Sequence, residues 1–312
     1  MAFDFDLAVS APFRMQPGLR RLPVGAQQLT PLRPGDCVLQ QKLAVLSEHA
    51  AQALLASPGF DAQPAVAALC AHAASEHPTA FAWDGAQGQA LHLGWAVYGD
   101  ELLPLPGAQT QIGTCLDALP AHSRLAGLLA LAFAEDFAIV DVDSGSIPWL
   151  AVCLPSHWAP ETKVGRSFAE VHAAVADNAM LIAAGAQLMR LVAADGRWER
   201  FVWSITPHPK LDAHPVRCPR QAWPADATPD QLAAVAYWRT ECQTFIPLPE
   251  LRQAVFTIRV EVQALARAVG NREQASRLHA ALASMSPAVL AYRGLTDAQG
   301  RLLEWLAVQA AR

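Results

Sequence analysis

The stretch at 254–262, AVFTIRVEV, constrains the fold more than any other part of the chain. Its apolar residues alternate one by one with polar residues, which is the period of a β-strand in a sheet with one buried face. Four other short segments are rich in branched and aromatic residues, at 137–142, 149–154, 198–205 and 237–245. The turn sequence DSGS at 143–146 lies between the first two of these and favours a hairpin.

Helical sequence separates the first two strands from the last three. Segments 168–175 and 178–193 have helical spacing, so the order along the chain is two strands, helices and three strands. This order predicts an α+β fold in which a PAS-like five-stranded antiparallel sheet is covered by helices. The segment 207–236 contains six prolines and is expected to be a long surface loop or lid.

Three regions are expected along the chain. Residues 1–134 should form an N-terminal arm and a helical cap with a small hairpin, residues 135–265 the PAS-like core, and residues 266–312 a helical tail packed on the core. Within the first region we expect an extended arm at 1–35, helices at 38–56, 64–75 and 117–136, and a hairpin of strands 80–84 and 90–98.

The composition argues against several classes of protein. With 53% hydrophobic and 16% charged residues, a chain of 312 residues can bury a large core. The net charge of −5 and the absence of a Lys/Arg run argue against a nucleic-acid partner. The longest apolar run, 125–134, is about half of what a bilayer requires, so no membrane association is expected. The six scattered cysteines and the N-terminus, which does not resemble a secretory signal, predict a cytoplasmic protein.

One histidine lies in an apolar helical row. Phe168, Val171, His172 and Val175 share the spacing of one helix face. His172 could be a core residue whose ring nitrogens bond to neighbouring groups, which is the common case. It could also be an axial ligand to haem iron, because haem needs an apolar slot with one neutral imidazole directed into it. The periodicity does not decide between these interpretations.

Several segments together resemble one family. They are EDFAIV (135–140), CLPSHWAPETKVGRSFAEVH (153–172), VWSI (202–205), RTECQTFIPLP (239–249), AVFTIRVEV (254–262) and YRG (292–294). In this order, over residues 12–295, they resemble the haem-dependent oxidative N-demethylase family, whose catalytic subunit is a haem-binding PAS-fold protein. The resemblance assigns His172 the role of proximal iron ligand.

The resemblance also implies an activity and partners. Members of the family use haem b and O2 to oxidise a small methylated amine, with electrons from NADPH that pass through partner subunits holding FMN and a 2Fe-2S centre. This chain has no Gly-rich nucleotide loop and no cysteine cluster. Its electrons are therefore expected from a flavin and iron-sulfur reductase subunit.

The expected site residues follow from the matched segments. Catalytic roles are expected for Arg239, Glu241 and Cys242, and cofactor contacts for Trp158, Arg166 and Trp203 in addition to His172. His157 and Lys163, beside Trp158 and Arg166, are further candidates for haem propionate partners, although an ordinary surface corner is an equal alternative. In a strand, Arg239 and Glu241 share one face and Cys242 lies on the other.

The sequence departs from the family pattern at four positions. Cys242 stands where the family usually has an arginine, and Val202 stands where it has an asparagine. Ala174 and Ala176 replace two prolines after the ligand histidine. Because O2 activation depends on donors and charge at the distal face, these changes leave haem binding expected and the demethylase chemistry open.

Three functions therefore remain open. The first is a haem monooxygenase that hydroxylates an N-methyl group, after which the carbinolamine collapses to formaldehyde and a shorter amine. The second is a haem-binding PAS protein that senses or carries a gas or small ligand without turnover. The third is an interaction module without cofactor, in which His172 is only a core residue.

Overall fold

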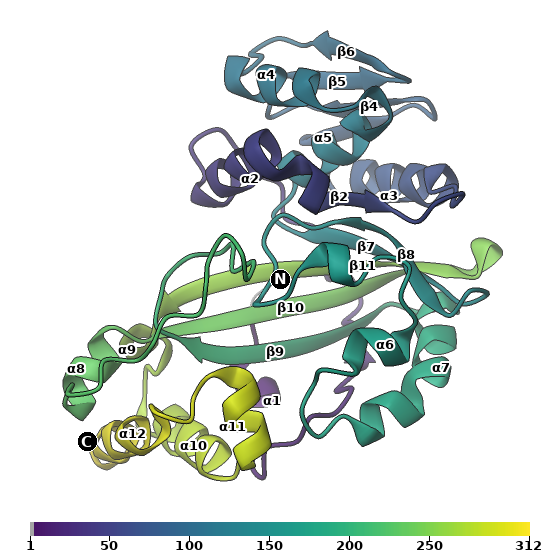
Figure 1. Cartoon of the computed structure of the whole chain (residues 1–312). Coiled ribbons are helices and arrows are strands. Elements are labelled where there is room, and N and C mark those ends of the chain that lie inside the picture. Colours follow the sequence, from purple (N-terminus) through teal and green to yellow (C-terminus); the bar gives the residue numbers. More distant parts are fainter. Residues whose placement is uncertain (1–2) are drawn as a thin grey trace.

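The centre of the molecule is an antiparallel sheet, seen in the computed structural model, which describes residues 3–312 (Figure 1). Its seven strands have the order β1-β9-β10-β11-β7-β8-β2. They are β1 (Arg20–Arg21), β2 (Leu54–Ala56), β7 (Asp136–Asp141), β8 (Ser146–Ala151), β9 (Trp198–Thr206), β10 (Tyr237–Leu248) and β11 (Gln253–Ala264). The two longest, β10 and β11, pair along their whole length, as the alternation in β11 predicts.

The α+β class is confirmed, but the sheet has seven strands and not five. The five predicted strands lie next to one another as β9, β10, β11, β7 and β8. The two additional strands come from the N-terminal part of the chain, where β1 pairs with β9 and β2 pairs with β8. Both are only two or three residues long, so they carry too few residues for an alternating pattern.

The cap contains four helices and a second sheet. The helices are α2 (Cys37–Ala53), α3 (Gln63–Glu76), α4 (Thr110–Ala118) and α5 (Arg124–Ala132), and the strands are β3 (Phe81–Trp83), β4 (Gln87–Ala90), β5 (Trp95–Tyr98) and β6 (Glu101–Pro104). The predicted hairpin is thus a four-stranded meander. The predicted helix at 117–136 was wrong, because the chain turns at Pro120 between α4 and α5 and then enters β7.

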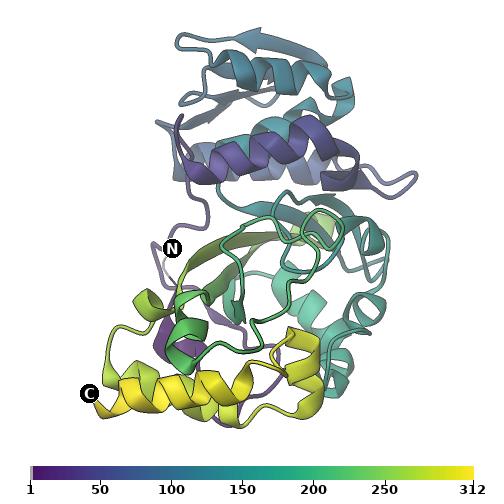
Figure 2. The same cartoon turned by 60° about the vertical axis from the view of Figure 1, so that its left-hand side comes forward.

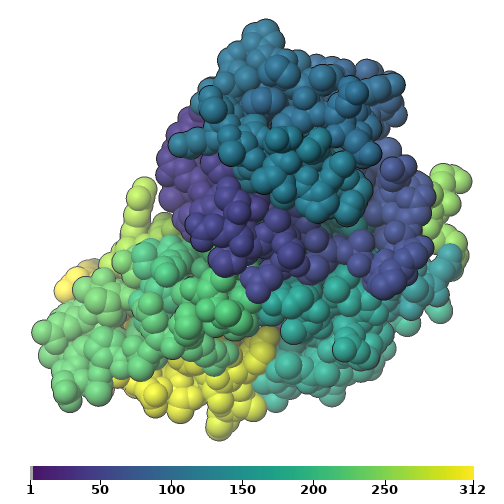
Figure 3. All heavy atoms as spheres, turned by 45° about the horizontal axis from the view of Figure 1, so that its top comes forward, coloured from purple at the N-terminus to yellow at the C-terminus, as the bar shows by residue number. Residues whose placement is uncertain are grey.

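A buried lysine joins the cap to the main sheet. Lys42 of α2 is fully buried, and its Nζ lies 3.0 Å from Asp136 Oδ1 at the start of β7. The same ammonium donates to the carbonyl oxygens of Phe133 and Glu135, while Asp136 Oδ2 accepts from the amide of Leu154. The largest hydrophobic cluster also runs from the cap helices to β7, β8 and β11, and Figure 3 shows the cap packed directly on the rest of the molecule.

The remaining helices lie on the other side of the sheet from the cap (Figures 1 and 2). They are α1 (Phe5–Ala8), α6 (Phe168–His172), α7 (Ala179–Ala193), α8 (Pro229–Ala234), α9 (Leu265–Ala268), α10 (Arg272–Ala283), α11 (Pro287–Arg293) and α12 (Gln299–Ala311). Helix α6 begins with a capping box formed by Ser167 and Glu170 and ends at His172, three residues earlier than predicted.

The proline-rich segment 207–236 is more ordered than a plain loop. It contains helix α8, and His208, Ala213, His214 and Trp223 within it are buried. The segment is fixed to the body in part by a hydrogen bond in which His214 Nε2 lies 3.0 Å from Glu161 Oε1. In residues 3–312, no helix is long and apolar enough to cross a bilayer.

Candidate haem site

A cavity of about 390 Å³ lies between the main sheet and helices α6 and α7, within the size range of small-molecule sites. Apolar side chains form most of its wall: Leu19, Ala138, Val140, Ile147, Leu150, Phe168, Val171, Val175, Leu181, Leu188, Met189, Val192, Val202, Phe245, Phe256 and Ile258. All five predicted strands contribute to the wall. The predicted N-terminal arm also contributes, through Met15, Pro17 and Leu19.

His172 lines this cavity, together with the other members of its predicted row. Each of the four side chains is partly exposed and borders the cavity. His172 Nδ1 lies 2.8 Å from the carbonyl oxygen of Phe168, and the two rings are in contact with centroids 4.1 Å apart.

This hydrogen bond defines what the imidazole can do. A carbonyl accepts only from N–H, so the proton is on Nδ1 and the lone pair of a neutral ring is on Nε2. No hydrogen bond of Nε2 occurs within residues 3–312. Burial lowers the pKa of His172, which favours the neutral ring at pH 7. Metal-binding histidines have this arrangement, in which the second nitrogen is held by a carbonyl.

The register of β10 divides the predicted catalytic residues between two faces. Arg239, Glu241 and Gln243 line the cavity. Cys242 points to the opposite face, which also carries Thr244, whose hydroxyl accepts a hydrogen bond from Gln28 of the arm. Cys242 is 2% exposed and does not border the cavity. Burial raises the pKa of its thiol to about 12, so the thiol stays protonated and away from the other site residues.

The guanidinium of Arg239 is occupied by neighbouring loops. It donates to Ser156 Oγ at 2.8 Å and to the carbonyl oxygens of Lys210, Pro155 and Leu211 at 2.7 to 3.1 Å. Burial lowers its pKa to about 10, so it is still charged at pH 7. Arg239 therefore joins segment 154–156 to the proline-rich segment at the edge of the cavity, and few of its donors remain for a ligand.

Glu241 is the only carboxylate among the cavity-lining residues of the described chain. Its Oε2 accepts a hydrogen bond of 2.5 Å from Gln243 Nε2. Its Oε1 has no hydrogen-bond partner within residues 3–312. A carboxylate that is oriented by one neighbour and open on the other oxygen can accept a hydrogen bond or a proton from a cationic ligand.

Arg200 is a site residue that the sequence reasoning missed. It lies opposite Gln243 in the sheet register, lines the cavity, and makes no hydrogen bond within residues 3–312, so that its buried Nε is left without a partner. Burial lowers its pKa, and its charge contributes to the lowered pKa of His172. Since β9 was predicted correctly, the period of two that relates Arg200 to Val202 and Ser204 could have indicated it.

The predicted cofactor contacts have different positions. Trp158 borders the cavity. Trp203 also borders it, but its indole is stacked on Trp238 with ring centroids 4.9 Å apart and donates to the carbonyl oxygen of Ala8. Arg166 is exposed and pairs with Glu170 of the same helical segment, outside the cavity. Lys163 does line the cavity, and its Nζ donates to the carbonyl oxygen of Val171.

His157 lines the cavity in a left-handed backbone conformation, with φ of 64°. Burial and the neighbouring Arg239 lower its pKa to about 4. Its ring meets that of His208 edge to face with centroids 5.5 Å apart, and His208 Nε2 lies 3.7 Å from Cys218 Sγ. In the described chain, no group of three or more His, Cys, Asp or Glu residues is arranged to hold a metal ion.

One family model matches this chain. The model of a family described as haem-dependent oxidative N-demethylase, alpha subunit-like, matches residues 38–303. The match covers most of the chain. The chain belongs to this family. The description names haem as the cofactor, and an alpha subunit implies partner subunits. His172, Glu241 and Arg200 all lie within the matched residues.

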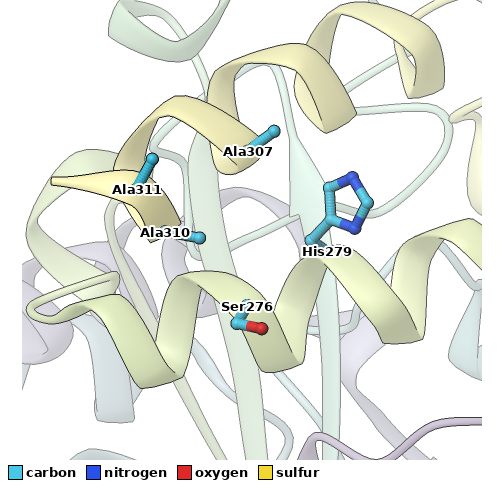
Figure 4. A pocket seen from close by; sticks show the side chains of 5 residues that line it. All are labelled: Ser276, His279, Ala307, Ala310 and Ala311. Atoms are coloured by element: carbon cyan, nitrogen blue, oxygen red, sulfur yellow. The ribbon is translucent and has the colours of Figure 1, made fainter.

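The residues of the cavity fit a haem group. Apolar side chains form most of its wall, a neutral imidazole offers an unshared Nε2, and Arg200 has an unpartnered buried Nε that could meet a propionate. A second hollow, between α10 and α12, is lined by Ser276, His279, Ala307, Ala310 and Ala311 (Figure 4). This hollow is a depression in the surface, and three of its five lining residues are alanines. It does not have the large apolar wall that a haem group needs.

Proposed function

We propose that this protein is the haem-binding subunit of an oxidative N-demethylase, which uses O2 to remove a methyl group from a small methylated amine. One observation carries the proposal. The imidazole of His172 is neutral, is fixed by the carbonyl of Phe168, and leaves Nε2 free beside an apolar cavity of about 390 Å³. The family match supports both the cofactor and the reaction class.

A PAS-like core is part of the proposal. Of the five predicted strands, the third, fourth, fifth, first and second lie side by side in that order. Helices α6 and α7, which follow the second strand in sequence, cover the face that lines the cavity. This order and this position of the helices support a PAS-like haem domain with two short strands added at its edges.

The residues of the chain then have separate roles in holding the cofactor. His172 Nε2 would bind the haem iron, and the hydrogen bond from Nδ1 to Phe168 would orient the ring and increase its basicity. Arg200 and Lys163, whose charges both act on His172, would hold the propionates. The apolar side chains of α7, β7 and β8 would exclude water. When bound, haem b supplies the activation of O2.

Glu241 would handle the amine. Its free Oε1 can accept a hydrogen bond from an alkylammonium ion and then take the proton that the nitrogen must lose before its lone pair is available. Gln243 holds the other oxygen and so fixes the orientation of the carboxylate. Arg239 acts as a positioning residue, because it fixes the two loops that close this end of the cavity.

Electrons would come from outside the chain. The sequence has neither a Gly-rich nucleotide loop nor a cysteine cluster, and all six cysteines are free thiols. This supports a separate reductase subunit that holds FMN and a 2Fe-2S centre and takes electrons from NADPH. It also supports a reducing compartment such as the cytoplasm.

An absorption spectrum of the purified protein, oxidised and then reduced with dithionite, tests the proposal first. We expect a Soret band, followed by amine-dependent consumption of O2 and of reductant with release of formaldehyde. If no Soret band appears after reconstitution with haem, the cavity does not serve this cofactor and an interaction module is the better description.

A haem-binding sensor or carrier is the second candidate. It is favoured by one observation, namely that Val202, which stands where the family has an asparagine, lines the cavity beside Glu241. The substitution removes a polar group from the face where O2 would bind. Spectral shifts with gases, without amine-dependent product, would favour this candidate over the demethylase.

A further inference from the structure

The charges that face the cavity are strongly unbalanced. In the part of the chain that the structure describes, one carboxylate, that of Glu241, lines the cavity together with five cationic side chains: Lys163, Arg200, Arg220, Arg239 and Arg293. The two propionates of a haem would offset only part of this excess. A simple alkylammonium substrate would add one more positive charge, which is unfavourable in a site of low dielectric constant. The imbalance therefore indicates a ligand with negative charge of its own.

Most of these cations already have a partner or a role. Arg239 is bonded to loop carbonyls and Ser156, and Arg220 donates to the carbonyl oxygens of Ala291 and Tyr292. Lys163 donates to Val171. With Arg200, which acts on His172, it suits the propionates under the proposed function. Arg293 is the cation that remains.

Arg293 is held in place by its neighbours, but the edge of its guanidinium formed by Nε and Nη2 has no strong acceptor within residues 3–312. It lies in the last turn of α11. Its guanidinium contacts the rings of Phe13 and Trp203, 4.8 and 5.3 Å from their centroids, and these two rings meet edge to face. Nη1 donates to the carbonyl oxygen of Trp203. Nη2 faces only the sulfur of Met15, 3.9 Å away. Nε is buried and has no partner within residues 3–312.

The edge formed by Nε and Nη2 of Arg293 has the geometry of a carboxylate-binding site. The N–H groups of Nε and Nη2 point in parallel from one side of a guanidinium, and a carboxylate can accept from both at once. A thioether is a weak acceptor that a carboxylate would displace at little cost. The contacts with the two rings and the hydrogen bond to Trp203 restrict the guanidinium, so little side-chain freedom is lost on binding.

We infer that the substrate is a methylated amine that also carries a carboxylate, such as an N-methyl amino acid, with the carboxylate on Arg293 and the ammonium on Glu241. Both residues line the same cavity, and the free Oε1 of Glu241 supplies the acceptor for the cationic end. The inference rests on the proposed function and specifies its substrate class.

Two ligands that differ by one carboxylate test the inference. Dimethylamine and N-methylglycine share the methylammonium group, and only N-methylglycine carries a carboxylate. We expect calorimetric titration of the haem-loaded protein to show at least roughly tenfold tighter binding of N-methylglycine, as a two-bond charge-assisted contact provides. Equal affinity, or a preference for dimethylamine, would overturn the inference.

Variants at position 293 then test the residue. In Arg293→Gln and Arg293→Lys, which remove the parallel N–H pair, the ratio of the two dissociation constants should fall towards one. Arg190→Gln, on the exposed face of α7, should keep the wild-type ratio. A variant at 293 that keeps the ratio, or that loses haem, would show that Arg293 does not bind the substrate carboxylate.

The readouts separate this inference from the proposed function. The Soret band reports haem binding independently of the calorimetry, so a protein without haem contradicts the proposed function while the two ligands can still be compared on it. If a variant at 293 fails to fold, as circular dichroism would show, the comparison of the two ligands on the wild-type protein still decides the inference.

Discussion

At the scale of single residues, the histidine in the apolar row has the most specific environment. The spacing alone allowed a core residue or a ligand. In the structure, Nδ1 of His172 is hydrogen-bonded to the carbonyl oxygen of Phe168, whereas Nε2 makes no hydrogen bond within residues 3–312. The residue lines the cavity. A core histidine would usually have both nitrogens satisfied.

His172→Ala should therefore abolish haem retention and leave the chain folded. The side chain makes one hydrogen bond, to the carbonyl of Phe168, so its loss costs little stability, whereas the variant has no imidazole to bind the haem iron. The absorption spectrum after haem reconstitution and gel filtration measures retention, and circular dichroism measures folding. His279→Ala, in the surface hollow of Figure 4, is the matched control. An unchanged Soret band in His172→Ala would contradict the assignment.

The stability of the haem-free protein should depend on pH through His157. Its pKa is about 4 in the folded protein, against 6.5 for an ordinary histidine. Between these values the unfolded chain binds a proton that the folded chain does not. The free energy of unfolding should therefore fall as the pH falls from 6.5 towards 4, by at most about 3 kcal/mol, with no contribution from this group above pH 7.

Urea unfolding at pH 7 and at pH 5 measures this effect. In His157→Asn, which tolerates the left-handed backbone, the loss of stability between the two pH values should be smaller. It should not vanish, because burial also lowers the pKa of His172 and His208. An identical loss in the wild type and the variant would show that His157 is not the group responsible.

Cysteine reactivity should distinguish the exposed thiol from the buried ones. Cys37 is exposed, whereas the other five cysteines are buried, and burial raises the pKa of Cys242 to about 12. Because the thiolate is the reactive form, iodoacetamide at pH 8 should alkylate Cys37 alone in the folded protein. Mass spectrometry of the digested protein identifies the modified residue. Rapid labelling of Cys242 would contradict its position on the buried face of β10.

At the scale of elements, the contact between α6 and α7 fixes the position of the ligand histidine. Gly185 of α7 is buried, and a Cβ at this position would lie 2.5 Å from Cδ1 of Phe168. Phe168 in turn contacts the ring of His172. The small residue thus allows the short helix α6 to lie close to α7, with its histidine at the cavity.

Gly185→Ala should weaken haem binding and destabilise the fold by about 1–3 kcal/mol, as overpacking does, although alanine is the better helix former. Gly300→Ala provides the control. Gly300 also lies in a helix, α12, but nothing lies within 4 Å of its added Cβ, so a gain of up to about 1 kcal/mol is expected. Urea unfolding and haem titration of both variants measure the effects. A stabilised Gly185→Ala protein with normal haem affinity would contradict the close contact.

At the scale of the whole molecule, the cap and the sheet share one hydrophobic core and a buried ion pair. The expected division at residue 134 falls between α5 and β7, where Lys42 of the cap bonds to Asp136 and to the adjacent carbonyls. The N-terminal region also supplies both short edge strands of the main sheet. Folding of the cap and of the haem site should therefore be coupled.

Lys42→Met should reduce the free energy of unfolding by about 3–5 kcal/mol, because it leaves the carboxylate of Asp136 buried without its cation. Arg166→Met, which breaks the exposed pair with Glu170, should change the free energy of unfolding far less, because water screens exposed charges. Denaturant unfolding of both variants gives the comparison. Similar values for the two would show that the buried pair does not hold the cap to the sheet.

Elements with a local sequence pattern could be predicted from the amino-acid sequence. The alternation of apolar and polar residues predicted β11, and the turn sequence predicted the hairpin of β7 and β8. Helical spacing predicted α7 to within one residue at each end. Strands β1 and β2 were missed because they are too short to show a periodic pattern. The end of α4 and the whole of α5 were predicted as one helix, although the chain turns between them. The six segments that resemble the haem-dependent oxidative N-demethylases predicted the family, and the match to the family model confirmed it.

Which side chains come together at the cavity depends on the packing of distant segments and could not be predicted from local patterns. A period of two places Glu241 and Cys242 on opposite faces, but which face borders the cavity depends on the helices that cover the sheet. The guanidinium of Arg293 is positioned by Phe13, Met15 and Trp203, which come from distant parts of the chain. Local patterns record the period of a segment, whereas a cavity is formed by contacts between segments far apart in sequence, and no single segment encodes them.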